Sequence, residues 1–428
     1  MACLKLSRLS AVWEVRTWVC LYLAWILFLA GHAAVCAAWE KRSGAPARGA
    51  DAPPAAGSEN VPGDCGKPKA AAGSVLSADP APQFAAAPKA ALAGGAGHGF
   101  GPADAAQERT RARLLRAEIV LLALCWAALL AEIAILRFIP LFSPEPHAYS
   151  AFHVSGLHYV TVSCVLVPAL SVLHLRTAGA APERRTLALH ACLTAAALLI
   201  PVLCVSRFQL VFAVGLAAVC AVLAGGKMRP AVLAGGGLAL LAVYVLLTVA
   251  RRHDVAYLNG IFEMKNEATP IFITQPYIYV TNNFENFNVL VRDLPAFAHG
   301  LRQLFPVFAF TGLKFLHPEW VTLPLYTTKW ELTTLTLIYD AYYDFGTAGV
   351  AVFALAAGAL CGAASLARRR GTNPVRLLLY AQAALYLCLS FFTTWLSNPT
   401  TWFYLGVTAL LWLYVGGVFP GRCRKQTA

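Results

Sequence analysis

The chain has 428 residues, of which 58% are hydrophobic and only 13% are charged, and its formal net charge is +13. Soluble domains carry roughly a quarter of charged residues, and they distribute them along every helix and strand. Here the charges gather at the ends of long apolar runs instead. The composition excludes a water-soluble globular protein and predicts an all-α, polytopic bundle of transmembrane helices.

Nine apolar segments are long enough to cross a bilayer, whose hydrocarbon core of about 30 Å needs about 20 helical residues. The fourth and fifth are short and nearly contiguous. In chain order, the segments are residues 17–39, 117–138, 157–175, 187–204, 208–223, 231–250, 346–366, 376–396 and 402–419.

Basic residues occupy alternate connections between these segments, which is typical of cytoplasmic loops. The C-terminal tail falls on the same side if each segment crosses once, so the C-terminus is expected in the cytoplasm. This pattern explains the positive charge, and we expect no nucleic-acid partner. The basic clusters are Arg109, Arg111, Arg113 and Arg116; Arg176, Arg184 and Arg185; Lys227 and Arg229; Arg368, Arg369, Arg370 and Arg376; and Arg422, Arg424 and Lys425 in the tail.

The direction of the first segment stays open, because basic residues both precede and follow it. A cleaved signal peptide ending near residues 34–38 is an alternative, but cleavage there would place the Arg109 cluster on the wrong face. The chain divides into residues 1–39 with the first segment, a linker at 40–109, segments two to six within 110–250, a long extracytoplasmic loop at 251–345, and the last three segments with a cytoplasmic tail at 346–428. The linker is rich in Ala, Pro and Gly and is expected to be disordered.

No signature of a cofactor or metal site accompanies these segments. Most of the 12 cysteines lie within apolar runs, and none forms a CxxC pair. P-loop, HExxH and GxSxG patterns are also absent from the sequence. We therefore expect neither a cofactor nor a metal.

Three arginines lie on the predicted outer face, against the usual bias: Arg207, Arg251 and Arg252. A guanidinium at a membrane edge either reaches for lipid headgroups or binds an anion, and its planar fork suits phosphate oxygens. Because three of them gather on one face, we favour an anion site, with a diphosphate as the ligand.

The outer loop is densest in aromatic and amide side chains around Tyr277, Tyr279, Asn282, Asn283 and Asn286. Aromatic faces stack on sugars and amides bond to hydroxyls, so these residues are candidates for glycan binding; an interfacial aromatic belt is the alternative. A general base would come from a carboxylate on this side. The acids available there are Asp254, Glu263, Glu285, Asp293, Glu319, Glu331, Asp340 and Asp344.

Several short motifs, taken in order, resemble one family. They are Ile139-Pro140-Leu141 with Tyr149, Phe152 and Gly156-Leu157-His158; Ser206-Arg207; Arg251-Arg252; Tyr277-Ile278-Tyr279 with Asn282-Asn283 and Asn286-Phe287; and Tyr343-Asp344-Phe345-Gly346 with Gly349. Together, over roughly residues 116–419, they resemble the bacterial oligosaccharide repeat unit polymerases, the Wzy-type O-antigen polymerases. The chain departs from that family in having the Ala/Pro-rich linker where further N-terminal spans are usual.

The resemblance implies a glycosyltransferase of the bacterial inner membrane that joins undecaprenyl-diphosphate-linked repeat units into O-antigen, capsule or exopolysaccharide at the outer face. It implies inversion without a metal, with lipid-linked donor and acceptor as partners and a chain-length regulator as a further candidate. Arg207, Arg251 and Arg252 would bind the diphosphate, and Asp344 or Glu285 would act as base. An O-antigen ligase, a transporter or flippase of lipid-linked oligosaccharides, and a membrane scaffold without a site remain alternatives.

Three residues near the outer face carry competing interpretations. His158 is either a base or an interfacial hydrogen-bond partner. Asp344 is either a base or the cap of its helix, with Gly346 and Gly349 permitting close packing. Glu132 is a further intramembrane charge, and its expected partner is Arg137.

Overall fold

The computed structural model describes residues 6–43, 102–145, 148–177, 182–225, 255–266, 268–369 and 373–417, together with residues 235–247 except 239, 240 and 244. These parts are all-helical and contain no strand, which confirms the predicted fold class. One isolated β-bridge pairs Ser7 with Met264.

The long helices are α1 (Val15–Ser43), α2 (Pro102–Leu136), α6 (Arg184–Leu203), α7 (Arg207–Leu223), α10 (Ile271–Asp293), α13 (Tyr339–Arg369), α14 (Val375–Cys388) and α15 (Pro399–Val415). Shorter helices connect them: η2 (Pro140–Phe142), α3 (Ala148–Ala151), α4 (Leu157–Val162), η3 (Ser163–Leu166), α5 (Val167–Arg176), α9 (Val255–Phe262), α11 (Phe305–Thr311), α12 (Leu313–Leu316), η4 (Pro318–Trp320) and η5 (Trp395–Ser397).

Five helices of the described chain are long and apolar enough to cross a membrane: Val15–Arg42, Ala105–Leu136, Leu157–Arg176, Arg184–Leu203 and Tyr339–Ala367. The shorter apolar helices Arg207–Leu223, Gly235–Leu247 and Val375–Cys388 occupy three further predicted segments. These findings support a membrane protein with several spanning helices.

Several of the predicted boundaries differ from the structure; α13, for example, begins at Tyr339, inside the predicted outer loop. α2 begins at Pro102, so residues 102–109 of the expected linker are helical, and proline suits the first turn of a helix. α14 ends at Cys388, well before residue 396, and beyond its end the carbonyls of Ser390 and Phe391 accept hydrogen bonds from Leu337 and Asn283. Residues 44–101 of the linker lie outside the described residues.

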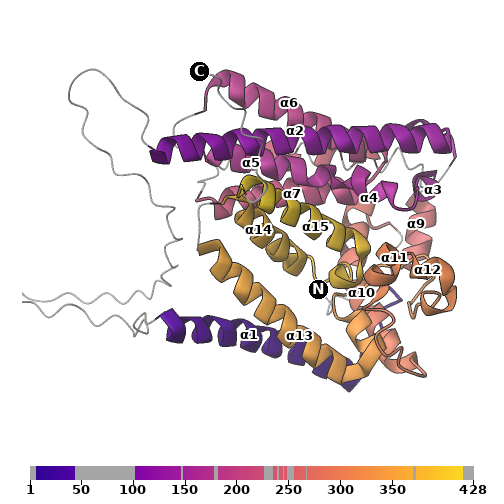
Figure 1. Ribbon diagram of the computed structural model, residues 1–428. Coiled ribbons are helices and arrows are strands. Elements are labelled where there is room, and N and C mark those ends of the chain that lie inside the picture. Colours follow the sequence, from indigo (N-terminus) through magenta and orange to yellow (C-terminus); the bar gives the residue numbers. More distant parts are fainter. Residues whose placement is uncertain are drawn as a thin grey trace, which may run out of the picture.

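The core lies among α2, α5, α6, α7, α14 and α15, which Figure 1 shows as one group of neighbouring helices. Aromatic rings fill part of it. The ring centroid of Phe212 lies 5.7 Å from Tyr386, 5.6 Å from Trp395 and 5.9 Å from Tyr404. These four side chains join α7, α14, η5 and α15.

The bundle has two ends, which we name the basic end, after the arginine-rich connections, and the α10 end. At the basic end, α2 begins and α15 ends, since Arg113 Nη1 donates to the carbonyl of Val415 at 3.4 Å. At the other end, the amide of Leu337 before α13 donates to the carbonyl of Ser390 after α14 at 2.7 Å. α10 lies at this second end (Figure 1).

α1 pairs with α13, and Figure 1 shows the two helices side by side. Cys20 of α1 meets Thr347 near the start of α13, with 3.6 Å between Sγ and Oγ1. Further along, Gly31 faces Leu355 and His32 faces Gly362. Both helices therefore start at the α10 end and end at the basic end, which gives the relative direction that the sequence left open.

Candidate functional site

A buried ion pair lies at the α10 end. Nε and Nη2 of Arg302 each lie 2.8 Å from Oδ1 of Asp340, in the first turn of α13. The side chains are only 17% and 4% exposed. The guanidinium also lies over Tyr343, 5.2 Å from its ring centroid. Burial opposes the charge of Arg302, but Asp340 outweighs it, so the pKa of Arg302 is raised above its ordinary value.

Asp344 builds the turn that presents Arg302. Its carboxylate accepts hydrogen bonds from the amides of Arg302 at 3.1 Å and Gln303 at 2.8 Å. The turn contains His299 and Gly300 with φ of 51° and 100°. Asp344 is thus a buried cap, but it caps this turn and not the helix in which it lies. Charged acceptors bind backbone N–H groups strongly, which fixes the position of Arg302.

A pocket of about 320 Å³ opens beside the ion pair and is lined by Arg302 and Asp340. Phe305 and Trp320 contribute aromatic walls. Hydroxyl and amide groups come from the connection between α14 and α15, at Thr394, Ser397 and Asn398. A cation, aromatic faces and neutral hydrogen-bonding groups together suit a sugar that carries a phosphate.

Arg207 is the first residue of α7 and is only 7% exposed. Its Nη1 lies 3.4 Å from Oε1 of Gln275 in α10. The next residue, Phe208, stacks on Phe392 with centroids 4.8 Å apart. Arg207 therefore joins α7 to α10 beside the α14–α15 connection. The two other predicted anion ligands, Arg251 and Arg252, lie outside the described residues.

His158, at the start of α4, is held by Glu132 of α2. The Nδ1–Oε1 distance is 3.0 Å, and Glu132 also accepts hydrogen bonds from Thr161 at 2.7 Å and from the amide of Val154 at 3.2 Å. The expected partner of Glu132 was Arg137, and the structure gives these three donors instead. The histidine side chain keeps 21% of its surface exposed, whereas Glu132 is fully buried. Burial, and then the proximity of His158, lower the pKa of His153.

The predicted glycan-binding amides of α10 face into the protein. Asn286 donates to the carbonyls of Leu332 at 2.7 Å and Thr334 at 3.0 Å and accepts from the amide of Thr328 at 2.8 Å. Asn283 donates to the carbonyls of Tyr279 and Phe391, at 2.6 and 2.7 Å. These asparagines order the loop between η4 and α13.

The remaining predicted residues of α10 meet other parts of the chain. Oδ1 of Asn282 accepts from Thr328, but Nδ2, although buried, has no hydrogen-bond partner within the described residues. The hydroxyl of Tyr277 accepts from the amide of Leu6 at 2.9 Å, and Glu285 accepts from the amide of Ala11 at 3.2 Å. Tyr279 packs edge-on against Phe392.

A second glutamate–histidine cluster lies inside α2, α5 and α6. Glu118 lies 3.0 Å from Nδ1 of His190, whose Nε2 lies 2.7 Å from Nδ1 of His174, and Ser171 donates to the same carboxylate. All four side chains are buried. The sequence carried a signal for this cluster, since an acid and two histidines inside apolar segments are rare in membrane helices.

The structure brings Asp344 together with Arg302, and Arg207 together with α10. His158 pairs with Glu132, and neither residue lines the pocket beside Arg302. Sequence reasoning missed Arg302. The available signal was weak: Asp340 and Asp344 are spaced to share one helix face, but nothing local pointed to an arginine before α11. Among the residues that the structure describes, no group of three His, Cys, Asp or Glu is placed to hold a metal ion.

Comparison with known proteins adds no relative to this picture. No family model, curated protein or solved structure matches the chain.

Proposed function

We propose that this membrane protein is a polymerase that joins undecaprenyl-diphosphate-linked oligosaccharide repeat units at the outer face of the bacterial inner membrane. The observation that carries the proposal is the buried Arg302–Asp340 pair in an aromatic pocket at the end opposite the basic loops. If the basic end is cytoplasmic, this pocket faces the side where lipid-linked units are polymerised.

Arg302 is suited to stabilise a diphosphate leaving group. Its position is fixed by Asp340 and by the turn that Asp344 caps, so little reorganisation is needed when charge develops on the leaving oxygen. Asp340 contacts Nε and Nη2 of the guanidinium. The phosphate would bind Arg302 from the pocket that this side chain lines. Arg207, Arg251 and Arg252 remain proposed as further diphosphate ligands. Among these, Arg207 is buried at the edge of the same α14–α15 connection.

The proposed reaction forms a bond between an acceptor hydroxyl oxygen and the anomeric carbon of the donor. The bond from that carbon to the diphosphate oxygen breaks, and inversion follows from in-line displacement. The hydroxyl proton passes to a base, and protein cations replace a metal in stabilising the diphosphate.

Among the three candidates we propose His158 as the base, which lies outside the lining of the pocket itself. Glu132 holds Nδ1, which orients the ring and leaves Nε2 as the proton acceptor. Asp344 and Glu285 already accept backbone amides, so we assign both a positioning role. α11 links the base to the pocket, because Phe305 at its start lines the pocket and Phe310 contacts Tyr159, the neighbour of His158, with centroids 5.7 Å apart.

A gel of surface glycan tests the proposal in a strain that lacks the gene and is restored with variants. Wild type should restore a ladder of chain lengths, whereas Arg302→Gln, present in the membrane at wild-type protein level, should leave a core with a single repeat. Arg292→Gln is the matched control, since Arg292 is an arginine of the same region that is 51% exposed and paired with Asp293. It should restore the full ladder.

Each other outcome points to a rival. Polymer accumulating on the lipid carrier, with none on lipid A, would indicate a ligase. Unpolymerised units retained on the cytoplasmic face would indicate a flippase. Full ladders from Arg302→Gln, at wild-type protein level, would overturn the role of the pocket. Purified enzyme that elongates chains only when magnesium is supplied after chelation would contradict metal independence.

A further inference from the structure

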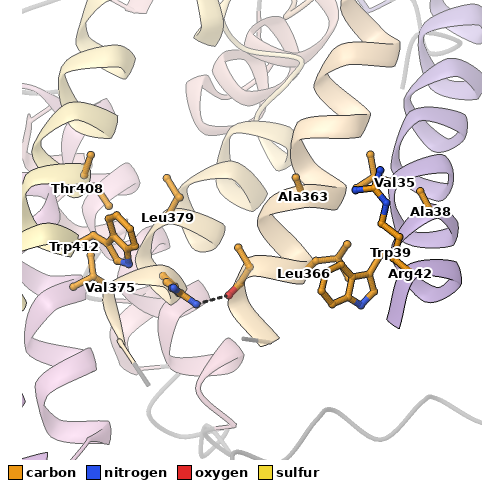
Figure 2. Close-up of a pocket in the computed structure, with 13 residues that line it drawn as sticks. Val35, Ala38, Trp39, Arg42, Ala363, Leu366, Val375, Leu379, Thr408 and Trp412 are labelled. Atoms are coloured by element: carbon orange, nitrogen blue, oxygen red, sulfur yellow. Dashed lines mark hydrogen bonds between the residues drawn. The ribbon is translucent and has the colours of Figure 1, made fainter. Parts of the chain in front are cut away.

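A second, larger groove lies at the basic end, between the α1–α13 pair and the α14–α15 pair (Figure 2). Its volume is about 670 Å³. α13 and α14 are joined at this end only by residues 370–374, and the groove lies between their neighbouring parts. Its walls are mainly apolar, with Val35, Leu366, Val375 and Leu379 among them.

Two arginines and two tryptophans line the same groove. Arg42 and Trp39 come from the last turns of α1, and Trp412 comes from α15 (Figure 2). Arg376 comes from the start of α14. Nη1 of Arg376 lies 3.4 Å from the carbonyl of Ala367, at the end of α13, and its guanidinium lies 5.8 Å from the ring centroid of Trp412. Tryptophan side chains favour the depth of the lipid headgroups, and arginine at that depth binds phosphate.

We propose that this groove binds one anionic phospholipid of the leaflet at the basic end. Its phosphate would lie at the level of Arg42 and Arg376, which line the same groove, and its acyl chains would lie along the apolar walls between α13 and α14. The charge at the headgroup level argues for an anionic lipid over a neutral one or an apolar helix. Basic pockets between membrane helices at the cytoplasmic side bind such headgroups.

This site is separate from the proposed polymerase site, which lies at the α10 end. The two hypotheses therefore stand or fall independently. Loss of lipid at the groove leaves Arg302 and Asp340 untouched, and a failed polymerase assay leaves the lipid measurement unchanged.

Native mass spectrometry of the purified full chain tests the proposal, with phosphatidylglycerol and phosphatidylcholine as probes at equal concentration. Wild type should retain one phosphatidylglycerol at concentrations where phosphatidylcholine is lost. The Arg42→Gln/Arg376→Gln variant should bind phosphatidylglycerol at least ten-fold more weakly, because each arginine contributes about five-fold at a membrane surface.

Two further variants make the result specific. Arg109→Gln/Arg176→Gln removes two exposed charges at the basic end away from the groove and should bind as wild type does. Ala363→Phe fills the groove from an exposed position without changing charge and should weaken binding of both lipids.

Four outcomes would overturn the proposal. Wild type could retain the two lipids equally, or the Arg109→Gln/Arg176→Gln control could lose as much phosphatidylglycerol as the Arg42→Gln/Arg376→Gln variant. Glycerol phosphate, which has no acyl chains, could bind as tightly as phosphatidylglycerol, or a stable dimer could form only when Ala363 is native. The last result would mean that a second copy covers the groove.

Discussion

Gly358 of α13 lies directly against the backbone of Phe28 in α1. A Cβ at this glycine would come 2.0 Å from the carbonyl oxygen of Phe28. One turn later, a Cβ at Gly362 would come 3.0 Å from the carbonyl oxygen of His32, and on the facing helix a Cβ at Gly31 would come 2.2 Å from that of Leu355. Small residues spaced one turn apart let membrane helices approach closely, so these glycines hold α1 on α13.

The first prediction concerns this contact. Gly358→Ala should separate the two helices and lower stability by about 1–3 kcal/mol, as overpacked interiors do. Gly406→Ala is the control, because no atom lies within 4 Å of a Cβ at this glycine of α15, and alanine favours a helix. Thermal unfolding in detergent measures both variants. Equal midpoints for the two would contradict the close approach.

The parallel arrangement of α1 and α13 makes a second prediction. In Thr347→Cys, the new thiol lies next to Cys20, since Oγ1 of Thr347 is 3.6 Å from its Sγ, and mild oxidation should join them. A Cys36→Ser background removes the native thiol that lies near Cys361 on the facing helix. With a protease site inserted between residues 60 and 90 in this background, the two fragments should run together on a denaturing gel after cleavage and separate on reduction. The same protein with native Thr347 should give separate fragments under both conditions. Fragments that separate without reductant in the cysteine variant would place α1 elsewhere.

A third prediction concerns the Arg302–Asp340 pair. Removing one member leaves the other buried and uncompensated, so Asp340→Asn and Arg302→Gln should each destabilise the protein by about 3 kcal/mol. Arg302→Met/Asp340→Leu should recover most of that loss, because no charge is left behind. Denaturant unfolding of the four proteins measures the coupling. A double variant as unstable as the sum of the single ones would mean that the two side chains act independently.

The sequence predicted the helices well because apolar length is a local property. Five of the nine segments overlap helices that are long and apolar enough to cross a membrane, three more overlap shorter apolar helices, and the last overlaps α15. It did not predict α10, whose 23 residues are rich in amides and aromatics and lack a long apolar run. The direction of α1 was also out of reach, since basic residues lie at both of its ends and only packing on α13 decides it.

The candidate site was harder to predict from the sequence, because its residues are brought together by contacts between distant segments. Arg207 stood out because it lies in the short outer connection between two apolar segments. Arg302 is recognisable only from its contact with Asp340, which is 38 residues away. Asp344 was noticed as an acid at the start of a helix, and its partners are backbone amides of a turn that no pattern marked. The sequence alone did not predict these side-chain contacts between distant segments.

A fourth prediction separates binding from structure among the asparagines of α10. Asn286→Ala removes a side chain that makes three hydrogen bonds to the backbone, and unsatisfied buried groups cost about 1–3 kcal/mol, so thermal stability should fall clearly. Asn282→Ala should cost less stability, because its Nδ2 has no protein partner in the described structure. If instead Asn286→Ala is fully stable but fails to bind a lipid-linked repeat unit, this asparagine contacts the glycan.

The fifth prediction tests whether Glu132 acts through His158. The carboxylate holds Nδ1 of the imidazole at 3.0 Å, so Glu132→Gln should lower the rate of chain elongation by about ten-fold, and His158→Gln by about a hundred-fold, typical of losing a general base. Residues that act as one unit are not additive, so Glu132→Gln should cost nothing further in the His158→Gln background. Thr161→Val, which removes only the 2.7 Å hydrogen bond to the same carboxylate, should have a small effect. An elongation assay on the purified protein measures the rates, and unfolding midpoints identify variants that are merely unstable. If Glu132→Gln lowers the rate as much in the His158→Gln background as in the wild type, the carboxylate stabilises the helix packing and does not act through His158.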